Sequence, residues 1–159
     1  MSDVKKIVDV DTYMPVLCEI LAQGKEVSLT ITGNSMAPFM AHGRDEILIT
    51  APDGPWKKGD MAFFKRENGQ YVMHRICRVE TDGKCFFVGD AQQIVEGPIR
   101  PEQIFGKIIK VKRKGKWIGP GNFWWEFFEH VWLNILPLRP ICWKFYGVLW
   151  KIGKKCGIM

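Results

Sequence analysis

A serine at position 35 has neighbours that suit chemistry at the rim of a sheet. Gly33-Asn34 before it is flexible, whereas Met36-Ala37-Pro38 after it is more rigid. Strand-like runs lead into this stretch at 27–32 and leave it at 46–50. The hydroxyl would therefore be held where the backbone of a peptide substrate can approach it. Because glycine, asparagine and serine are common turn residues, a plain turn is the alternative interpretation.

A serine hydroxyl becomes a useful nucleophile when a base accepts its proton, and a neutral imidazole does this near pH 7. The chain has three histidines. His42 lies in a loop and is expected to be solvated, and His130 lies in an aromatic tail and is expected at an interface. His74 lies in the alternating run 70–80, where a strand would hold it rigidly. A purely structural histidine is the alternative for His74.

Several further motifs follow the serine stretch in a fixed order. They are Lys58-Gly59-Asp60 with the apolar Met61-Ala62-Phe63-Phe64, then Tyr71-Val72-Met73-His74-Arg75-Ile76, Gly89-Asp90 and Gly106-Lys107-Ile108. Together with Ser35-Met36-Ala37-Pro38, these motifs resemble the serine peptidase superfamily that contains signal peptidases and LexA-type repressors. The resemblance covers about residues 25–113.

The resemblance implies roles for three residues. Ser35 would be the nucleophile and His74 the base, as in the subgroup similar to eukaryotic and archaeal-type signal peptidases; other members have a lysine there. Asp90 would orient His74 as the third member of a triad. Gly89-Asp90-Ala91 matches only the first two residues of the family's Gly-Asp-Asn box, so a turn cap is the alternative for Asp90.

The oxyanion hole implied by the resemblance is incomplete. The backbone N–H of Ser35 is the natural donor to a developing oxyanion. Many signal peptidases add a serine hydroxyl two positions before the nucleophile, but this chain has Gly33 there. No metal or organic cofactor is expected.

The expected fold is mainly β, a twisted, barrel-like sheet core of the signal-peptidase/LexA type with an N-terminal helix and a helical tail. The expected parts are 1–24 with a helix at Asp11–Gln23, a peptidase-like domain at 25–118 and an amphipathic tail at 119–159. The predicted strands are 27–32, 46–50, 61–66, 70–80, 84–88 and 104–113, with 104–118 as a last strand pair. Asn68-Gly69 and Asp82-Gly83 predict tight hairpins.

Composition indicates a single globular domain, since the chain has 159 residues and is 47% apolar. Five cysteines without metal spacing indicate reduced thiols. No secretory signal or membrane span precedes Ser35, so we expect a cytoplasmic protein, with the inner face of the membrane as a candidate site of peripheral contact.

The net charge of +6 is unevenly spread, because 107–159 holds eleven Lys or Arg and two Glu. The tail is rich in Trp and Phe, and two amphipathic helices at 123–136 and 140–153 are expected there. Such a tail suits an anionic membrane surface, which makes 122–159 the expected membrane contact. The alternative is that its aromatic side chains pack over the barrel or against another subunit. Nucleic acid is not expected as a partner, because no DNA-reading motif is recognisable.

The function expected from these features is a serine endopeptidase that cleaves a leader or precursor peptide with a Ser35–His74 dyad or a Ser35–His74–Asp90 triad. One alternative is a non-catalytic module on the same fold that binds peptides or membranes. A second is a LexA-like self-cleaving protein, which is disfavoured because 1–34 contains no Ala-Gly or Cys-Gly pair.

Overall fold

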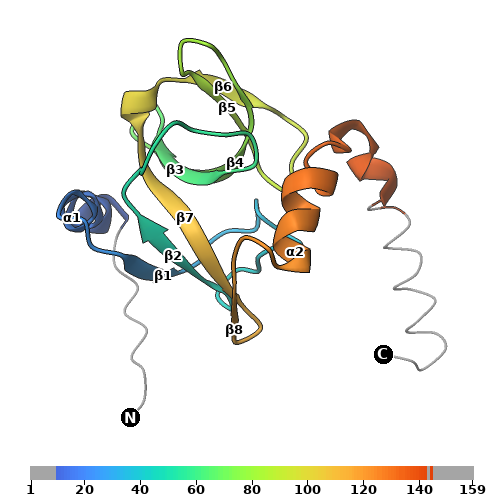
Figure 1. The fold of residues 1–159 in the computed structure, drawn as a ribbon, viewed down its shortest axis with the longest axis horizontal. Coiled ribbons are helices and arrows are strands. Elements are labelled where there is room, and N and C mark those ends of the chain that lie inside the picture. The colour runs from blue at the N-terminus through green and yellow to red at the C-terminus, as the bar shows by residue number, and fades with distance from the viewer. Residues whose placement is uncertain (1–9, 143, 145–159) are drawn as a thin grey trace.

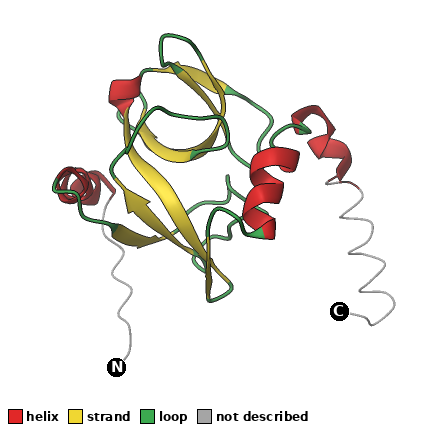
Figure 2. Cartoon of the chain, in the orientation of Figure 1, coloured by secondary structure: helices red, strands yellow, loops and turns green. Residues whose placement is uncertain are grey.

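The computed structural model describes residues 10–142 and residue 144, and its strands form one antiparallel sheet (Figures 1 and 2). The strands are β1 (Val27–Thr30), β2 (Glu46–Thr50), β3 (Met61–Lys65), β4 (Tyr71–Val79), β5 (Cys85–Val88), β6 (Glu96–Ile99), β7 (Ile104–Arg113) and β8 (Lys116–Ile118). Their order is β1-β2-β7-β3-β4-β5-β6, and β8 pairs with β7. The prediction of a mainly β protein is confirmed, with the sheet curled over β3–β6 but not closed.

The two predicted hairpins are present between β3 and β4 and between β4 and β5. Gly69 and Gly83 adopt φ angles of 92° and 84°, in the left-handed region that glycine enters without steric cost. The strand β6 was not predicted. Its sequence, Glu96-Gly97-Pro98-Ile99, contains glycine and proline, which are both unfavourable in strands, and it is held at the sheet edge by pairing with β5.

Helix α1 (Val10–Ala22) confirms the predicted N-terminal helix and covers one end of the sheet beside β1 and β7. Leu17 and Leu21 are fully buried, as their helical spacing predicts, whereas Val16 is half exposed. The side chain of Leu21 reaches Gly106 of β7, where an added Cβ would lie 3.4 Å from its Cδ1 atom. The helix therefore closes the core on this side of the sheet.

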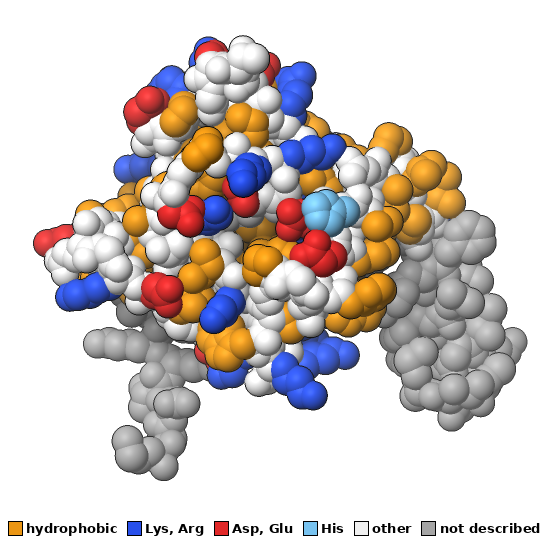
Figure 3. All heavy atoms as spheres, viewed as in Figure 1, with side chains coloured by type: hydrophobic (Ala, Val, Ile, Leu, Met, Phe, Trp, Pro, Cys, Tyr) orange, Lys and Arg blue, Asp and Glu red, His pale blue; other side chains and the backbone are white. Residues whose placement is uncertain are grey.

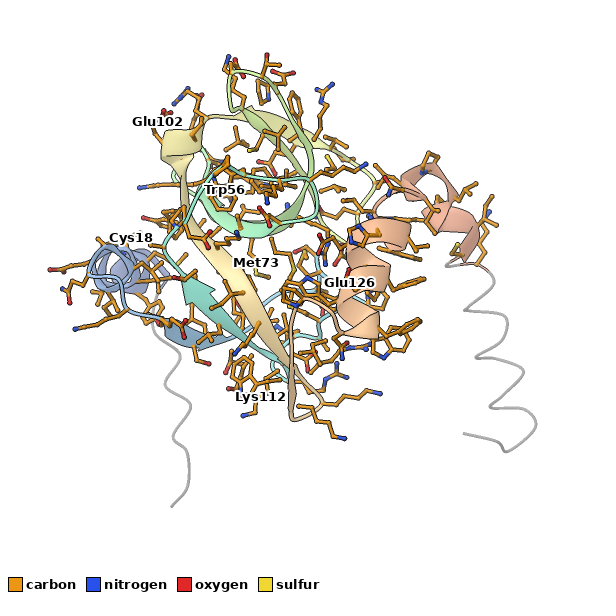
Figure 4. The ribbon with its side chains drawn as sticks, in the orientation of Figure 1. Cys18, Trp56, Met73, Glu102, Lys112 and Glu126 are labelled. Carbon is orange, nitrogen blue, oxygen red and sulfur yellow. The ribbon has the colours of Figure 1, made fainter. Side chains whose placement is uncertain are left out.

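The sheet has a buried cluster on each face, and β4 contributes to both. Met73 belongs to the larger cluster, which faces α1 and α2, and Ile76 belongs to the smaller one inside the curl of β3–β6 (Figures 1 and 4). Strict alternation predicted Val79 on the face of Met73, but Val79 packs with Ile76. The reason is a register shift between Ile76 and Arg78, because an extra residue in a bulge reverses the alternation beyond it.

The first part of the aromatic tail is part of the core. Helix α2 (Phe123–Glu126) continues directly into a π-helical segment, η2 (Phe127–Trp132), and a 3-10 turn, η3 (Leu136–Leu138), follows. The buried side chains of this segment are Trp125, Phe128, Trp132 and Leu133. The predicted helix at 123–136 thus ends four residues early, and the alternative in which tail aromatics pack on the sheet holds for the three aromatic residues among these. Most of the predicted helix at 140–153 lies outside the described residues.

Candidate active site

Ser35 lies half-buried in the loop 31–45 that joins β1 to β2. Three apolar side chains next to it anchor the loop in the larger core cluster; they are Met36, Phe39 and Met40. The N–H of Gly33 donates a hydrogen bond of 2.9 Å to Nδ1 of His42. His42 therefore supports the serine loop, a role that its position in a loop did not predict.

The far end of the serine loop is fixed by the buried carboxylate of Asp45. It accepts hydrogen bonds from the backbone N–H groups of Ala41 and Lys114, and both oxygens accept from the guanidinium of Arg44. Burial alone would raise the pKa of Asp45, but these hydrogen bonds outweigh it and lower the pKa. A charged Asp45 thus ties the loop to the β7–β8 hairpin.

His74 lies on β4 opposite Ala62 of β3, and its side chain is only 3% exposed. Its Nδ1 atom has no hydrogen-bond partner among the described residues. Burial lowers the pKa of His74 to about 4, while the charge of Glu96 raises it and that of Arg66 lowers it. The imidazole is therefore neutral near pH 7, which is the form that can accept a proton.

Gly89 follows β5 directly and packs against Ser35. In the β4–β5 pair Arg75 is opposite Val88, the last residue of β5. A Cβ at Gly89 would lie 2.6 Å from the carbonyl oxygen of Ser35.

The carbonyl oxygen of Ser35 therefore packs against Gly89 at a distance that only glycine permits. The N–H of Ala91 also donates a 2.8 Å hydrogen bond to the Ser35 carbonyl oxygen. Among the hydrogen bonds of the described residues, none joins Ser35 to His74 directly. The structure thus places Ser35 against the residues that follow β5, without a direct bond to His74.

Asp90 is bound by Arg75 and not by His74. Both carboxylate oxygens accept hydrogen bonds of 3.1 Å from the guanidinium of Arg75, and both side chains are fully buried. Arg75 also donates to the carbonyl oxygen of Gly59 and lies over the ring of Phe39. Because Arg75 and His74 are consecutive on a strand, their side chains point to opposite faces. The expected contact between Asp90 and His74 is thus absent from the described structure.

Gln92 is a polar residue of this region that the sequence did not single out. Its side-chain oxygen would lie 2.9 Å from a Cβ on Gly89, so the amide covers the same position as the Ser35 carbonyl. It follows the Gly89-Asp90-Ala91 stretch directly, where the family box that this stretch resembles has an asparagine one residue earlier. The signal in the sequence was therefore a side-chain amide one position later than the asparagine of the family box.

The thiols of Cys18, Cys77 and Cys85 are poor candidates for a nucleophile. Burial raises the pKa of Cys85 to about 11, and it also raises the pKa values of Cys18 and Cys77. A protonated, buried thiol reacts slowly, because the thiolate is the nucleophilic form. No group of three or more His, Cys, Asp or Glu that could hold a metal ion occurs within the described residues.

Comparison with known proteins does not identify the chain: no protein-family model matches it, and no curated protein matches it either. None of the helices in the described part of the chain has the length and apolar character needed to span a bilayer.

Gly89→Ala should disturb the serine loop, since the added methyl group would meet the Ser35 carbonyl oxygen rather than a flexible side chain. We expect a loss of about 1–3 kcal/mol in the free energy of unfolding, measured by urea denaturation. Gly54→Ala is the matched control, because a Cβ there meets nothing within 4 Å. Equal stabilities of the two variants would contradict the close approach at Gly89.

The lowered pKa of His74 predicts a loss of stability in mild acid. Below pH 6.5 the unfolded chain binds a proton at His74 that the folded chain does not bind until about pH 4. The free energy of unfolding should therefore fall by about 3 kcal/mol more in wild type than in His74→Gln between pH 7 and pH 4. Urea denaturation of both proteins across this range measures the difference. Parallel pH profiles would show that the imidazole is not held neutral by burial.

Proposed function

We propose that the protein is a serine endopeptidase related to signal peptidases, with Ser35 as nucleophile and His74 as base, that cleaves a leader or precursor peptide. The observation that carries the proposal is the packing of Ser35 against Gly89, which follows β5, the strand paired with the β4 strand of His74. Burial keeps His74 in the neutral form that can accept a proton, and its pKa of about 4 makes it a weaker base than a free imidazole.

In the proposed reaction the imidazole of His74 takes the proton from Oγ of Ser35 while Oγ attacks the carbonyl carbon of the scissile bond. The backbone N–H of Ser35 would donate to the resulting oxyanion. His74 then passes the proton to the leaving amine, and the peptide C–N bond breaks to leave an ester on Ser35. A water molecule, deprotonated by His74, hydrolyses this ester and restores the free hydroxyl.

The geometry favours a dyad over a triad. Asp90 is held by Arg75, so in this proposal it acts on the shape of the turn after β5. The acidic group whose charge favours the imidazolium of His74 is Glu96, which raises its pKa. Ile94 and Val95, which follow the turn after β5, expose apolar side chains. These side chains suit an uncharged, extended substrate segment.

Labelling with a biotinylated fluorophosphonate tests the activated serine. Ser35→Ala should abolish labelling, and His74→Ala should slow it by about a hundredfold or more, the usual contribution of a general base. Matched controls are Ser28→Ala on the exposed side of β1 and His130→Ala, whose side chain lies on the surface beside Glu126. Both controls should label at the rate of wild type.

A peptide-library cleavage assay accompanies the labelling, because some signal peptidases resist such reagents. Wild-type protein that neither labels nor cleaves any peptide would contradict the proposal. The non-catalytic binding module would then be the better account of the same fold. The missing hydrogen-bond partner at Nδ1 of His74, within the described structure, favours that alternative.

An exposed aromatic–basic surface supports a second proposal, that the protein contacts an anionic membrane. The surface consists of Lys112, Arg113, Lys114, Lys116, Trp117, Phe123 and Trp124. Phe123 is 69% exposed, and the guanidinium of Arg113 lies 4.8 Å from the ring of Trp124. Figure 3 shows Lys and Arg side chains along the lower edge with hydrophobic side chains beside them, and Figure 4 places Lys112 at that end of β7. Exposed aromatics beside cations are typical of interfacial binding.

Co-sedimentation with vesicles of phosphatidylglycerol and phosphatidylcholine tests this surface. Replacing Phe123 and Trp124 by serine should weaken binding about tenfold or more, because less apolar area enters the interface. Ile94→Ser removes an apolar side chain that is 83% exposed elsewhere and serves as the control. Substitutions are preferable to truncation, since the tail also supplies core residues. Unchanged binding of the aromatic variant would refute the proposal.

A further inference from the structure

Arg139 is a tail residue whose guanidinium is 1% exposed and lies against the turn next to Ser35. Its Nη1 atom donates to the carbonyl oxygens of Gly89 at 2.9 Å and Gln92 at 2.8 Å. Its Nε and Nη2 atoms both donate to the carbonyl oxygen of Trp132 at 3.2 Å. A buried cation is costly unless its N–H groups are satisfied, and here backbone carbonyl oxygens satisfy them.

Trp132 adds a second contact from the tail to the same turn. Its indole N–H donates a 2.8 Å hydrogen bond to the carbonyl oxygen of Asp90, and its ring lies 5.3 Å from the guanidinium of Arg139. Three carbonyl oxygens of the turn 89–92 thus accept hydrogen bonds from the tail. The planar guanidinium suits this arrangement, because its N–H groups point in fixed directions.

The other side of the turn contacts Ser35. The N–H of Ala91 donates to the Ser35 carbonyl oxygen, and the backbone of Gly89 packs against the same oxygen. The turn therefore lies between the tail and the serine. A shift of the turn would be passed on to Ser35 through these contacts.

We propose that Arg139 is a positioning residue for Ser35, acting through the turn 89–92, so that the C-terminal tail completes the active site. This inference rests on the proposed peptidase function. An apolar side chain of similar size could fill the space, but it would remove the donor to the carbonyl oxygens of Gly89 and Gln92. The guanidinium fixes the orientation of the carbonyl groups of Gly89 and Gln92. The position of Ser35, which contacts the same turn, is thereby fixed as well.

The test uses the full chain and compares wild type with Arg139→Met, Arg139→Lys and Trp132→Phe. Trp132→Phe removes the indole hydrogen bond to Asp90 and keeps an aromatic ring, so the same measurements are made on it if Arg139→Met does not fold. Leu21→Ala in α1 is the control for lost stability alone, because Leu21 is buried at the α1 end of the core, beside Gly106 of β7. All measurements are made well below the melting temperatures of the variants.

The first readout, independent of catalysis, is amide hydrogen exchange of Ala91 followed by NMR. Arg139→Met should lower the protection of the Ala91 amide by about tenfold relative to Leu21→Ala, because the turn is released locally. Wild-type protection at Ala91 in folded Arg139→Met would overturn the inference whatever the activity.

The second readout is the rate of fluorophosphonate labelling of Ser35 as a function of pH. We expect a plateau rate about tenfold to a hundredfold lower in Arg139→Met, since small displacements of a nucleophile have effects of this size. The pH midpoint should stay that of wild type, because His74 is unchanged, and Arg139→Lys should recover part of the rate.

Full labelling despite lost protection at Ala91 would overturn the positioning role. If wild type neither labels nor cleaves peptides, the proposed function fails, and the positioning role fails with it. A loss of Ala91 protection would in that case still show that the tail holds the turn, so the two failures are distinguishable.

Discussion

The buried ion pair between Arg75 and Asp90 is the interaction on which the rest of the site depends. Both side chains are fully buried, and the guanidinium also binds the carbonyl oxygen of Gly59 and lies over Phe39 of the serine loop. Removing one partner of such a pair typically costs about 3–5 kcal/mol, because the other charge remains buried. The pair therefore joins β4, the turn after β5 and the serine loop into one unit.

The ion pair also separates two kinds of chemistry on the two faces of β4. One face carries Arg75 in an ion pair with Asp90, and the other carries His74, which burial keeps neutral. Gly89 is the point at which the carbonyl oxygen of Ser35 packs against the residues after β5, since it has no side chain to block the approach. The ion pair thus occupies one face of β4 and leaves the uncharged imidazole of His74 on the other.

The tail extends this arrangement beyond the sheet. Trp125 and Phe128 fill the core against Phe39, while Trp132 and Arg139 bind the carbonyl groups of the turn. The same segment therefore provides hydrophobic burial and specific hydrogen bonds. Its exposed aromatic residues, at the start of α2, lie beside the basic β7–β8 hairpin, where Arg113 also donates to the carbonyl oxygen of Pro38 in the serine loop.

Most of the strands, both glycine hairpins and α1 were predictable from the sequence. Period-two alternation, turn residues and helical spacing are local signals, so they do not depend on distant residues. The sequence also placed Ser35 after a strand and His74 within one. The partner of Asp90 could not be predicted from local patterns. Alternation puts His74 and Arg75 on opposite faces of β4, but only the packing of the turn after β5 determines that Asp90 lies on the face of Arg75. β6 and the contacts of Arg139 likewise depend on residues that are distant in the sequence, so no local sequence pattern could predict them.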